Sequence, residues 1–336
     1  MEKSQLLYIY GPASSGKGVL TRLLDGHPAL AVHPNHDKIP NGITNIDSWG
    51  KINNSKYFKH LRNALGNTNY YQFEDFAHKR DVGIVTNADE HGDANQRMEL
   101  DFYEAEKEWT NKLISNRPDS CENIILTLFE SLFNHWTEYP RPQEKYKYYT
   151  GMGAPRPDPM ESLVANSDDV KILFIERDPR AVVASHGAKP SNTINNRIKM
   201  GITYRARGNI QAARELNSQY PDQVEILSFR KLILDTDNVM SRIAKFLDIN
   251  DDGILHIPTF CGDELKPRNN FVGEIKDEWK EIVSAPQRCA LDLQTRRIPA
   301  RVNIEGVRMY LLSIFIYGGI KLYKRVGSLG QKELFD

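Results

Sequence analysis

The stretch "QLLYIYGPASSGKGVLTRLL", residues 5–24, decides the fold. Residues 5–10 are a continuous apolar and aromatic run with the length of a buried strand, and the apolar residues of 19–24 then recur at helical spacing. Between them Gly11, Gly16 and Lys17 match the phosphate-binding pattern G-x-x-x-x-G-K-[ST]. Gly18 stands where that pattern has Ser or Thr. The stretch therefore predicts a strand, an anion-binding loop and a helix.

Buried strands and helices continue to alternate along the chain. Strands are expected at 29–33, 170–176 and 224–229, and helices at 122–136, from the Asp178-Pro179 turn through 183, at about 193–216 and at 238–249. Residues 145–159 are aromatic at first and then broken by Gly and Pro, which predicts a loop or flap. Buried parallel strands need helices on both faces. The predicted fold is thus α/β, a mostly parallel central sheet flanked by helices in a P-loop NTPase-like three-layer architecture.

The composition of the chain limits which partners it can bind and indicates the compartment in which it folds. The 336 residues include 44 basic and 44 acidic side chains, so no overall field attracts nucleic acid, and none is expected as a partner. The three cysteines are widely spaced and contain no C-x-x-C pair, which predicts neither a disulfide framework nor a metal site. The short segment before residue 5 leaves no room for a signal peptide, so a cytoplasmic location is expected.

An apolar segment near the C-terminus, "MYLLSIFIYGGI" at 309–320, is shorter than the roughly 20 residues of a spanning helix. It predicts a docked terminal helix and no transmembrane segment. The basic residues Lys321, Lys324 and Arg325 that follow leave a weak peripheral membrane contact as an alternative use of this helix.

The loop after the first strand has the composition of an anion site. A glycine-rich turn between strand and helix directs backbone N–H groups and the positive end of the helix dipole to one place. Lys17 adds a charge, Ser14 and Ser15 add hydroxyl donors, and Gly16 and Gly18 complete the candidate binding set. In kinases a Ser or Thr at the place of Gly18 binds Mg²⁺ through its side-chain hydroxyl, and glycine has no side-chain oxygen to do so. The loop therefore favours an anion held without metal, although Thr21 is a substitute ligand from the next turn.

A second segment, "FIERDPRAVVAS" at 174–185, strongly resembles the sulfotransferase family. In that family an Arg at the strand end and a Ser on the following helix grip the 3′-phosphate of 3′-phosphoadenosine 5′-phosphosulfate (PAPS). The resemblance implies these roles for Arg177 and Ser185, with PAPS as co-substrate and no metal. The alternative for Arg177 is an ion pair with Glu176 or Asp178. The neighbouring Arg180 is expected to face solvent.

Two further stretches resemble the same family. The opening loop is similar to the family's 5′-phosphosulfate loop, except that the lysine follows the Ser-Gly pair as Lys17 and does not precede it. The stretch "LKPRNNFVGEIKDEW" at 265–279 is similar to a late loop near the cofactor, which implies that Arg268 and Asn269 cover the adenosine or its 3′-phosphate.

Sulfuryl transfer needs a base for the acceptor hydroxyl. Many family members place a carboxylate or histidine after the second strand, and here "PNHDK" at 34–38 puts His36 there, with His33 and Asp37 as rivals. An ordinary histidine has a pKa of about 6.5 and is largely neutral at pH 7, so it can accept a proton. His36 and Lys17 are the predicted catalytic residues.

The resemblance implies one sulfotransferase-like domain over residues 1–336. Within it, 34–165 is the expected inserted acceptor-binding region and 299–336 the C-terminal helix and tail. The expected reaction transfers a sulfuryl group from PAPS to an acceptor hydroxyl, first of a carbohydrate and then of a lipid or small metabolite. The alternatives are a P-loop small-molecule kinase and a nucleotide-binding protein without activity.

Overall fold

The computed structural model describes residues 3–12, 14–37, 102–116, 120–136, 145–153, 157–187, 194–260, 263–264, 278–296 and 305–316. Contacts between residues divide the chain into two compact units. The first contains Met1–Gly11, Gly16–Glu176 and Ala213–Glu274, and the second contains Pro12–Ser15, Arg177–Ala212 and Ile275–Asp336. The single domain expected over residues 1–336 stays a prediction.

A five-stranded parallel sheet forms the centre of the first unit. Its strands are β1 (Gln5–Tyr10), β2 (Leu30–Asp37), β3 (Tyr148–Gly153), β4 (Val170–Glu176) and β5 (Val224–Ser228). They are ordered β2-β3-β1-β4-β5, and all four neighbouring pairs are parallel. β1 is hydrogen-bonded on both sides, so a continuous apolar run is the sequence it requires. The predicted α/β class is confirmed.

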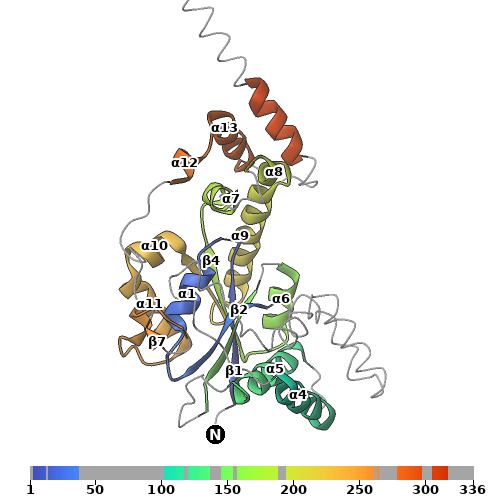
Figure 1. Ribbon diagram of the computed structural model, residues 1–336, viewed down its shortest axis with the longest axis vertical. Coiled ribbons are helices and arrows are strands. Elements are labelled where there is room, and N and C mark those ends of the chain that lie inside the picture. The colour runs from blue at the N-terminus through green and yellow to red at the C-terminus, as the bar shows by residue number, and fades with distance from the viewer. Residues whose placement is uncertain are drawn as a thin grey trace, which may run out of the picture. The chain divides into compact units, whose positions relative to one another are not determined.

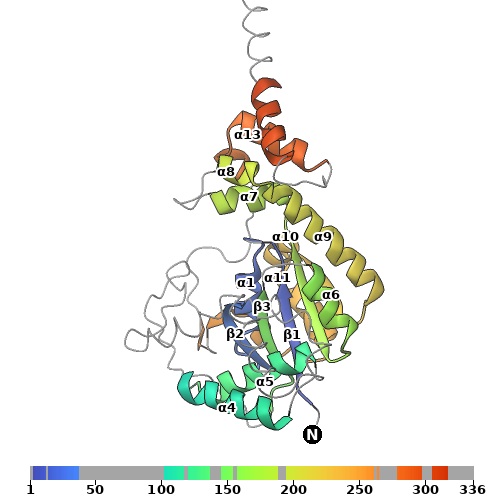
Figure 2. The same ribbon diagram turned by 90° about the vertical axis from the view of Figure 1, so that its right-hand side faces the viewer.

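Helices cover both faces of this sheet (Figures 1 and 2). One face packs on α1 (Lys17–Leu24), α10 (Phe229–Leu234) and α11 (Thr236–Leu247). On the other side α5 (Cys121–Asn134) packs on β1 and β3, and α6 (Pro157–Ala165) packs on β4. The remaining elements of this unit are α4 (Phe102–Asn116) beside α5, a short 3-10 helix (Ile254–His256) and an antiparallel pair, β6 (Thr259–Phe260) and β7 (Asp263–Glu264).

The core between the sheet and α1 joins residues distant in the sequence. Leu7 and Ile9 of β1 lie with Leu173 of β4, Leu20 of α1 and Ile243 of α11, and all five side chains are buried. Successive strand residues point to opposite faces, so alternate residues of β1 serve this core. Leu20, Leu23 and Leu24 of α1 all belong to this core, which explains the helical spacing of the leucines in "VLTRLL".

The loop or flap predicted at 145–159 is wrong over Tyr148–Gly153, which form β3 between β1 and β2. One of the glycines that suggested a turn, Gly153, has a packing role. A Cβ at Gly153 would lie 2.9 Å from Cε1 of Tyr10 and 3.3 Å from Cε1 of Tyr8. The strand therefore needs glycine to pass beside stacked aromatic rings. The region 34–165, expected as an insertion, thus contributes one strand, β3, to the central sheet.

The single helix predicted at about 193–216 is also wrong. The chain forms α8 (Ile194–Lys199) and α9 (Ile202–Gln219), separated at Gly201, whose φ of +65° is left-handed. The apolar spacing continues across the break, because both helices pack their apolar faces inward.

The second unit has a small helical core. α7 (Pro179–Gly187), α8, α12 (Glu278–Ile282) and α13 (Ala285–Gln294) contribute Val183, Ala184, Ile198, Trp279, Ala290 and Leu291 to it, and Val283 between α12 and α13 completes it. Residues 305–316 form a further helix. Ser284 and Gln287 form a capping box at the start of α13, which fixes where that helix begins.

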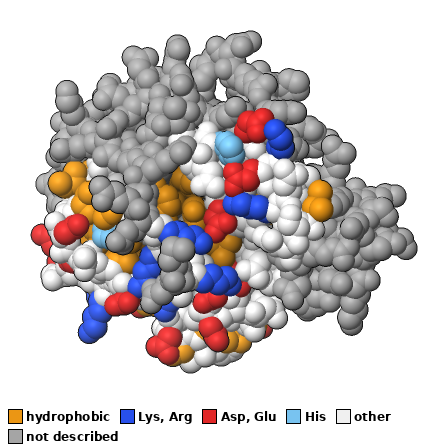
Figure 3. All heavy atoms as spheres, turned by 90° about the horizontal axis from the view of Figure 1, so that it is seen from below, with side chains coloured by type: hydrophobic (Ala, Val, Ile, Leu, Met, Phe, Trp, Pro, Cys, Tyr) orange, Lys and Arg blue, Asp and Glu red, His pale blue; other side chains and the backbone are white. Residues whose placement is uncertain are grey.

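Several charged side chains of the first unit are paired with opposite charges. Lys147 Nζ lies 2.8 Å from Asp248, and Lys3 Nζ lies 3.0 Å from Asp169 and 3.3 Å from Glu122. On the face of the molecule shown in Figure 3, basic and acidic side chains lie beside one another. Positive and negative side chains are thus balanced within small areas of the surface as well as in the whole sequence.

Candidate functional site

The candidate site begins at the carboxyl ends of two neighbouring strands. β1 and β4 pair in parallel, from Leu6 with Val170 to Tyr10 with Phe174. Parallel neighbours end at the same edge of a sheet, and ligands of open α/β sheets bind outside that edge. The two segments that resemble the sulfotransferase motifs are the chains that leave β1 and β4.

Gly16 is required where the loop enters α1. It is the N-cap of this helix with a φ of +100°, and its carbonyl accepts the first helical bond from Leu20 N at 3.1 Å. A Cβ on Gly16 would collide with the ring of Phe229, the first residue of α10. Glycine is thus demanded both by the backbone angle and by Phe229. No sequence pattern indicated Phe229, because its contact with the loop is tertiary.

Gly18 has no such constraint. It is exposed on the first turn of α1, and outside its own helix no heavy atom of the described residues would lie within 4 Å of a Cβ there. The nearby hydroxyl of Thr21 donates to the Lys17 carbonyl at 2.9 Å and contacts Sδ of Met152 at 3.4 Å. The missing hydroxyl at position 18 is therefore a chemical feature of the loop and not a result of crowding, and Thr21 is engaged elsewhere.

Lys17 is a buried ammonium group on the first turn of α1. Its exposed fraction is 3%, and Nζ donates to the Gly11 carbonyl at 2.6 Å. Burial lowers the pKa of Lys17 from its usual range to about 7. An anion near Nζ would favour the charged form and raise this pKa, so the residue is suited to binding a negative group.

In the second unit Arg177 meets the loop segment. Arg177 Nη1 donates to the Ser14 carbonyl at 2.6 Å, across 163 residues of sequence. Ser14 has a φ of +59°, and Ser15 N donates to Pro12 O at 3.1 Å in a tight turn. This bond brings the two sequence motifs into direct contact.

Ser15 has a buried hydroxyl with no hydrogen-bond partner among the described residues. Its side chain is 1% exposed, and Oγ makes no hydrogen bond to any of the residues that the structure describes. A buried polar atom without a partner costs stability. An anionic oxygen would satisfy it, and this fits the phosphosulfate that the loop is expected to hold.

The two carboxylates expected as alternative partners of Arg177, Glu176 and Asp178, form ion pairs with other arginines. Arg214 Nη2 lies 2.8 Å from Glu176, and Arg180 Nη2 lies 2.8 Å from Asp178. The expectation that Arg180 faces solvent holds only in part, since its side chain is 34% exposed and makes further contacts. It also reaches Asp292 at 2.8 Å, and its guanidinium lies 4.9 Å from the Trp279 ring centroid. Arg180 thus holds the start of α7 to α12 and α13.

Ser185 lies in the second half of α7 and is half-buried. The preceding Val182, Val183 and Ala184 are buried and orient this helix. The structure gives no contact that tests its predicted role with phosphate.

The candidate bases lie on β2. His36 and Asp37 pair with Met152 and Gly153 of β3, after an irregularity in register between Val32 and His36. This places them at the carboxyl end of the strand, beyond the expected strand end at residue 33. His33 is half-buried, and its ring centroid lies 5.8 Å from that of Phe129. Arg268 and Asn269 lie outside the described residues.

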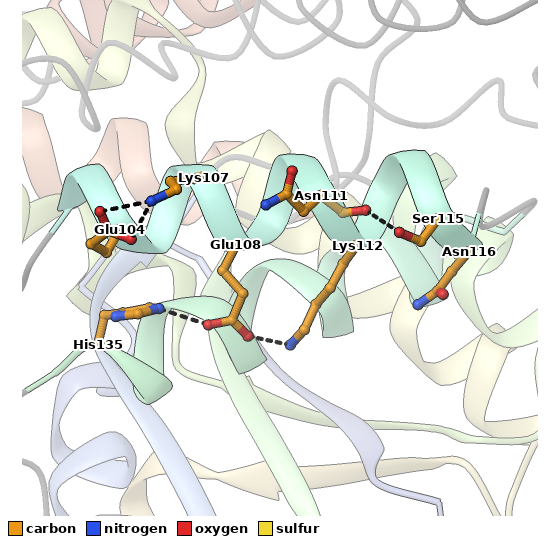
Figure 4. A pocket seen from close by; sticks show the side chains of 8 residues that line it. All are labelled: Glu104, Lys107, Glu108, Asn111, Lys112, Ser115, Asn116 and His135. Atoms are coloured by element: carbon orange, nitrogen blue, oxygen red, sulfur yellow. Dashed lines mark hydrogen bonds and ion pairs between the residues drawn. The ribbon is translucent and has the colours of Figure 1, made fainter.

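A polar groove of about 360 Å³ lies elsewhere in the first unit, along α4 (Figure 4). Glu108 is its centre, with Lys112 at 2.7 Å and His135 at 2.7 Å. None of the predicted site residues is among the residues that line it. Its charges are matched within the groove, and the loop motifs are not part of it.

The described architecture is that of a three-layer, P-loop-like α/β protein. No family model and no curated protein sequence matches the chain.

Solved sulfotransferase structures are similar to it. The sulfotransferase domain from the Synechococcus PCC 7002 olefin synthase has 16% identity and a TM-score of 0.45, over 93% of this chain and 95% of that one. The sulfotransferase domain from the curacin biosynthetic pathway has 13% identity and a TM-score of 0.39, over 92% and 97%. A sulfotransferase from Alicyclobacillus acidocaldarius has 13% identity and a TM-score of 0.39, over 88% and 97%. All three belong to the class that the two motifs resemble.

Proposed function

We propose that this protein transfers a sulfuryl group from PAPS to an acceptor hydroxyl. The observation that carries the proposal is the bond from Arg177 to the Ser14 carbonyl, which joins the two motif segments. A phosphate loop alone does not distinguish PAPS from ATP, because both carry a 5′-linked phosphate chain. A second cationic group for a 3′-phosphate makes that distinction.

The loop residues are assigned to the 5′ end of the cofactor. The Ser15 hydroxyl, buried without a partner among the described residues, donates to an anionic oxygen. Lys17 stabilises the charge that grows on the leaving phosphate as the bond from sulfur to the phosphate oxygen breaks. Its lowered pKa means that binding of the anion is coupled to uptake of a proton near pH 7.

Arg177 and Ser185 are assigned to the 3′-phosphate, and Arg268 and Asn269 to the adenosine side. An arginine fork donates two bonds to phosphate oxygens, and each charge-assisted bond is worth roughly 1.5–3 kcal/mol. Arg177 already donates through one Nη to the loop. It would thus position the loop and bind the phosphate with the same guanidinium.

The transfer itself is an in-line displacement. The acceptor oxygen attacks sulfur, adenosine 3′,5′-bisphosphate leaves, and the acceptor proton passes to a base on β2, His36 first and His33 or Asp37 as rivals. A carbohydrate hydroxyl is the first acceptor to test, and a lipid or small metabolite is the next. No metal is assigned a role.

Binding of adenosine 3′,5′-bisphosphate tests the proposal. We expect it to raise the melting temperature of the full chain, with EDTA present, more than adenosine 5′-phosphate does. We expect Arg177→Ala to weaken bisphosphate binding about tenfold to a hundredfold, since one or two charge-assisted bonds are lost. Adenosine 5′-phosphate should lose much less affinity, because it has no 3′ group.

The matched control is Arg205→Ala, which removes an exposed arginine of α9. Equal losses for both nucleotides in Arg177→Ala would assign the residue a structural role only. If the protein does not bind the bisphosphate but binds ATP in a way that requires Mg²⁺, the proposal is wrong and the P-loop kinase hypothesis is favoured. Labelled PAPS with a panel of acceptor hydroxyls then separates an enzyme from an inactive binding protein.

A further inference from the structure

The helix formed by residues 305–316 is attached to the second unit by one face. A Cβ on Gly306 would lie 2.6 Å from the Lys199 carbonyl, so the two backbones are in close contact. Gln294 Nε2 donates to the Gly306 carbonyl at 3.3 Å, and Lys199 Nζ lies 5.1 Å from the Tyr310 ring centroid. Ser313 is fully buried on the same side. The helix is therefore held at its start and along this face.

The opposite face of the helix is apolar and exposed. Phe315 is 80% exposed and Leu311 is 59% exposed. We call these two residues, with Val307, Leu312 and Ile314, the apolar face; all five are at least 40% exposed. Leu311 and Ile314 follow Val307 by four and seven residues, the spacing of one side of a helix. Exposed contiguous apolar surface marks an interaction site. The helix is drawn in dark red in Figure 1.

The charge of the surrounding sequence identifies the partner. From residue 306 to 332 the chain has no acidic residue and five basic ones: Arg308, Lys321, Lys324, Arg325 and Lys332. Arg308 pairs with Glu305 at 3.2 Å, so the basic residues after the helix carry the excess charge of this segment, before Glu333 and Asp336. Anionic lipid headgroups attract such a segment. A second copy of this chain would bring an equally basic segment toward the first, and like charges oppose that contact.

None of the described helices is long and apolar enough to cross a membrane. A helix with one apolar side and flanking basic residues lies in the plane of the bilayer interface.

We propose that the apolar face of the helix at 305–316 binds the surface of a bilayer that contains anionic lipids. Phe315 and Leu311 enter the boundary between headgroups and acyl chains, and the basic residues that follow contact the headgroups. The face is independent of the residues assigned to sulfuryl transfer, so the two proposals fail independently.

Flotation of the full chain with vesicles tests this proposal. We expect binding to phosphatidylcholine vesicles that contain phosphatidylglycerol, and binding that is much weaker to phosphatidylcholine alone. Leu311→Ser with Phe315→Ser should lower partitioning about tenfold or more. Ile114→Ser is the matched control, because Ile114 is 50% exposed on α4 outside this helix, and it should leave partitioning unchanged.

A second variant tests the charges separately. Lys321→Gln with Lys324→Gln should lower partitioning to the anionic vesicles roughly fivefold for each charge removed, and added salt should have a similar effect. Melting temperatures confirm that the variants fold. Three results would overturn the proposal. They are no flotation of the wild-type chain, equal flotation with neutral and anionic vesicles, or a dimer in solution that dissociates in the serine variant and is unchanged by vesicles.

Discussion

Two glycines of one loop differ in what they do. Gly16 has a left-handed backbone and lies against Phe229, whereas Gly18 has ordinary helical surroundings and open space. The first is required by the fold of the loop. The second leaves the loop without a ligand for Mg²⁺, because serine or threonine at that position would provide a hydroxyl oxygen.

Gly16→Ala should therefore destabilise the protein by several kcal/mol. The added methyl collides with Phe229, and alanine is strained at a φ of +100°. Gly18→Ala should change the free energy of unfolding by less than about 1 kcal/mol, in the direction of higher stability, since alanine is the better helix former. Urea unfolding of both variants measures the difference. Equal effects would show that Phe229 yields to the methyl group.

At the scale of elements, the sequence predicted several segments closely. The strand expected at 170–176 is β4, and the helix expected at 122–136 is α5 at Cys121–Asn134. Both are long, uninterrupted patterns with a single period. The prediction for β3 failed because Gly153 makes room for Tyr8 and Tyr10, and rings on a neighbouring strand leave no signal in the sequence of β3 itself.

A second element-scale test concerns the docking of the helix at 305–316. Gly306→Ala should loosen this helix and cost about 1–3 kcal/mol, because the methyl would lie 2.6 Å from a backbone carbonyl that cannot rotate away. Gly208→Ala in α9 is the control. Outside its own helix, none of the described residues has a heavy atom within 4 Å of a Cβ there, so alanine should stabilise the helix by about 0.8–1 kcal/mol.

Hydrogen exchange of the backbone amides of 305–316 measures the loosening directly. Unchanged exchange in Gly306→Ala would contradict the close contact with Lys199.

At the scale of the whole molecule, buried Lys17 makes stability depend on pH. Its pKa is about 7 in the folded chain, against the ordinary lysine value of 10.5. The unfolded chain thus binds more protons between these two values, and stability rises with pH across that window. Below pH 7 both states are charged, and the burial cost is fully present.

Comparison with Lys17→Met isolates this effect from other titrating groups. The variant should be more stable than wild type at pH 7, and the difference should shrink by about 3 kcal/mol between pH 7 and 9.5. Urea unfolding at the two pH values measures it. A constant difference would show that Lys17 keeps its ordinary pKa when buried.

The sequence by itself determined the class of fold and the two motif segments. Apolar runs of strand length and helical spacing reflect burial of faces, which is a local property, so β1, α1 and β4 could be read from residues 5–24 and 170–176. The tertiary structure alone decided that β3 lies beside β1, that Phe229 fixes Gly16, and that Arg177 donates to Ser14. These contacts join residues more than a hundred positions apart, and which distant side chains meet depends on strand order and packing, not on local pattern.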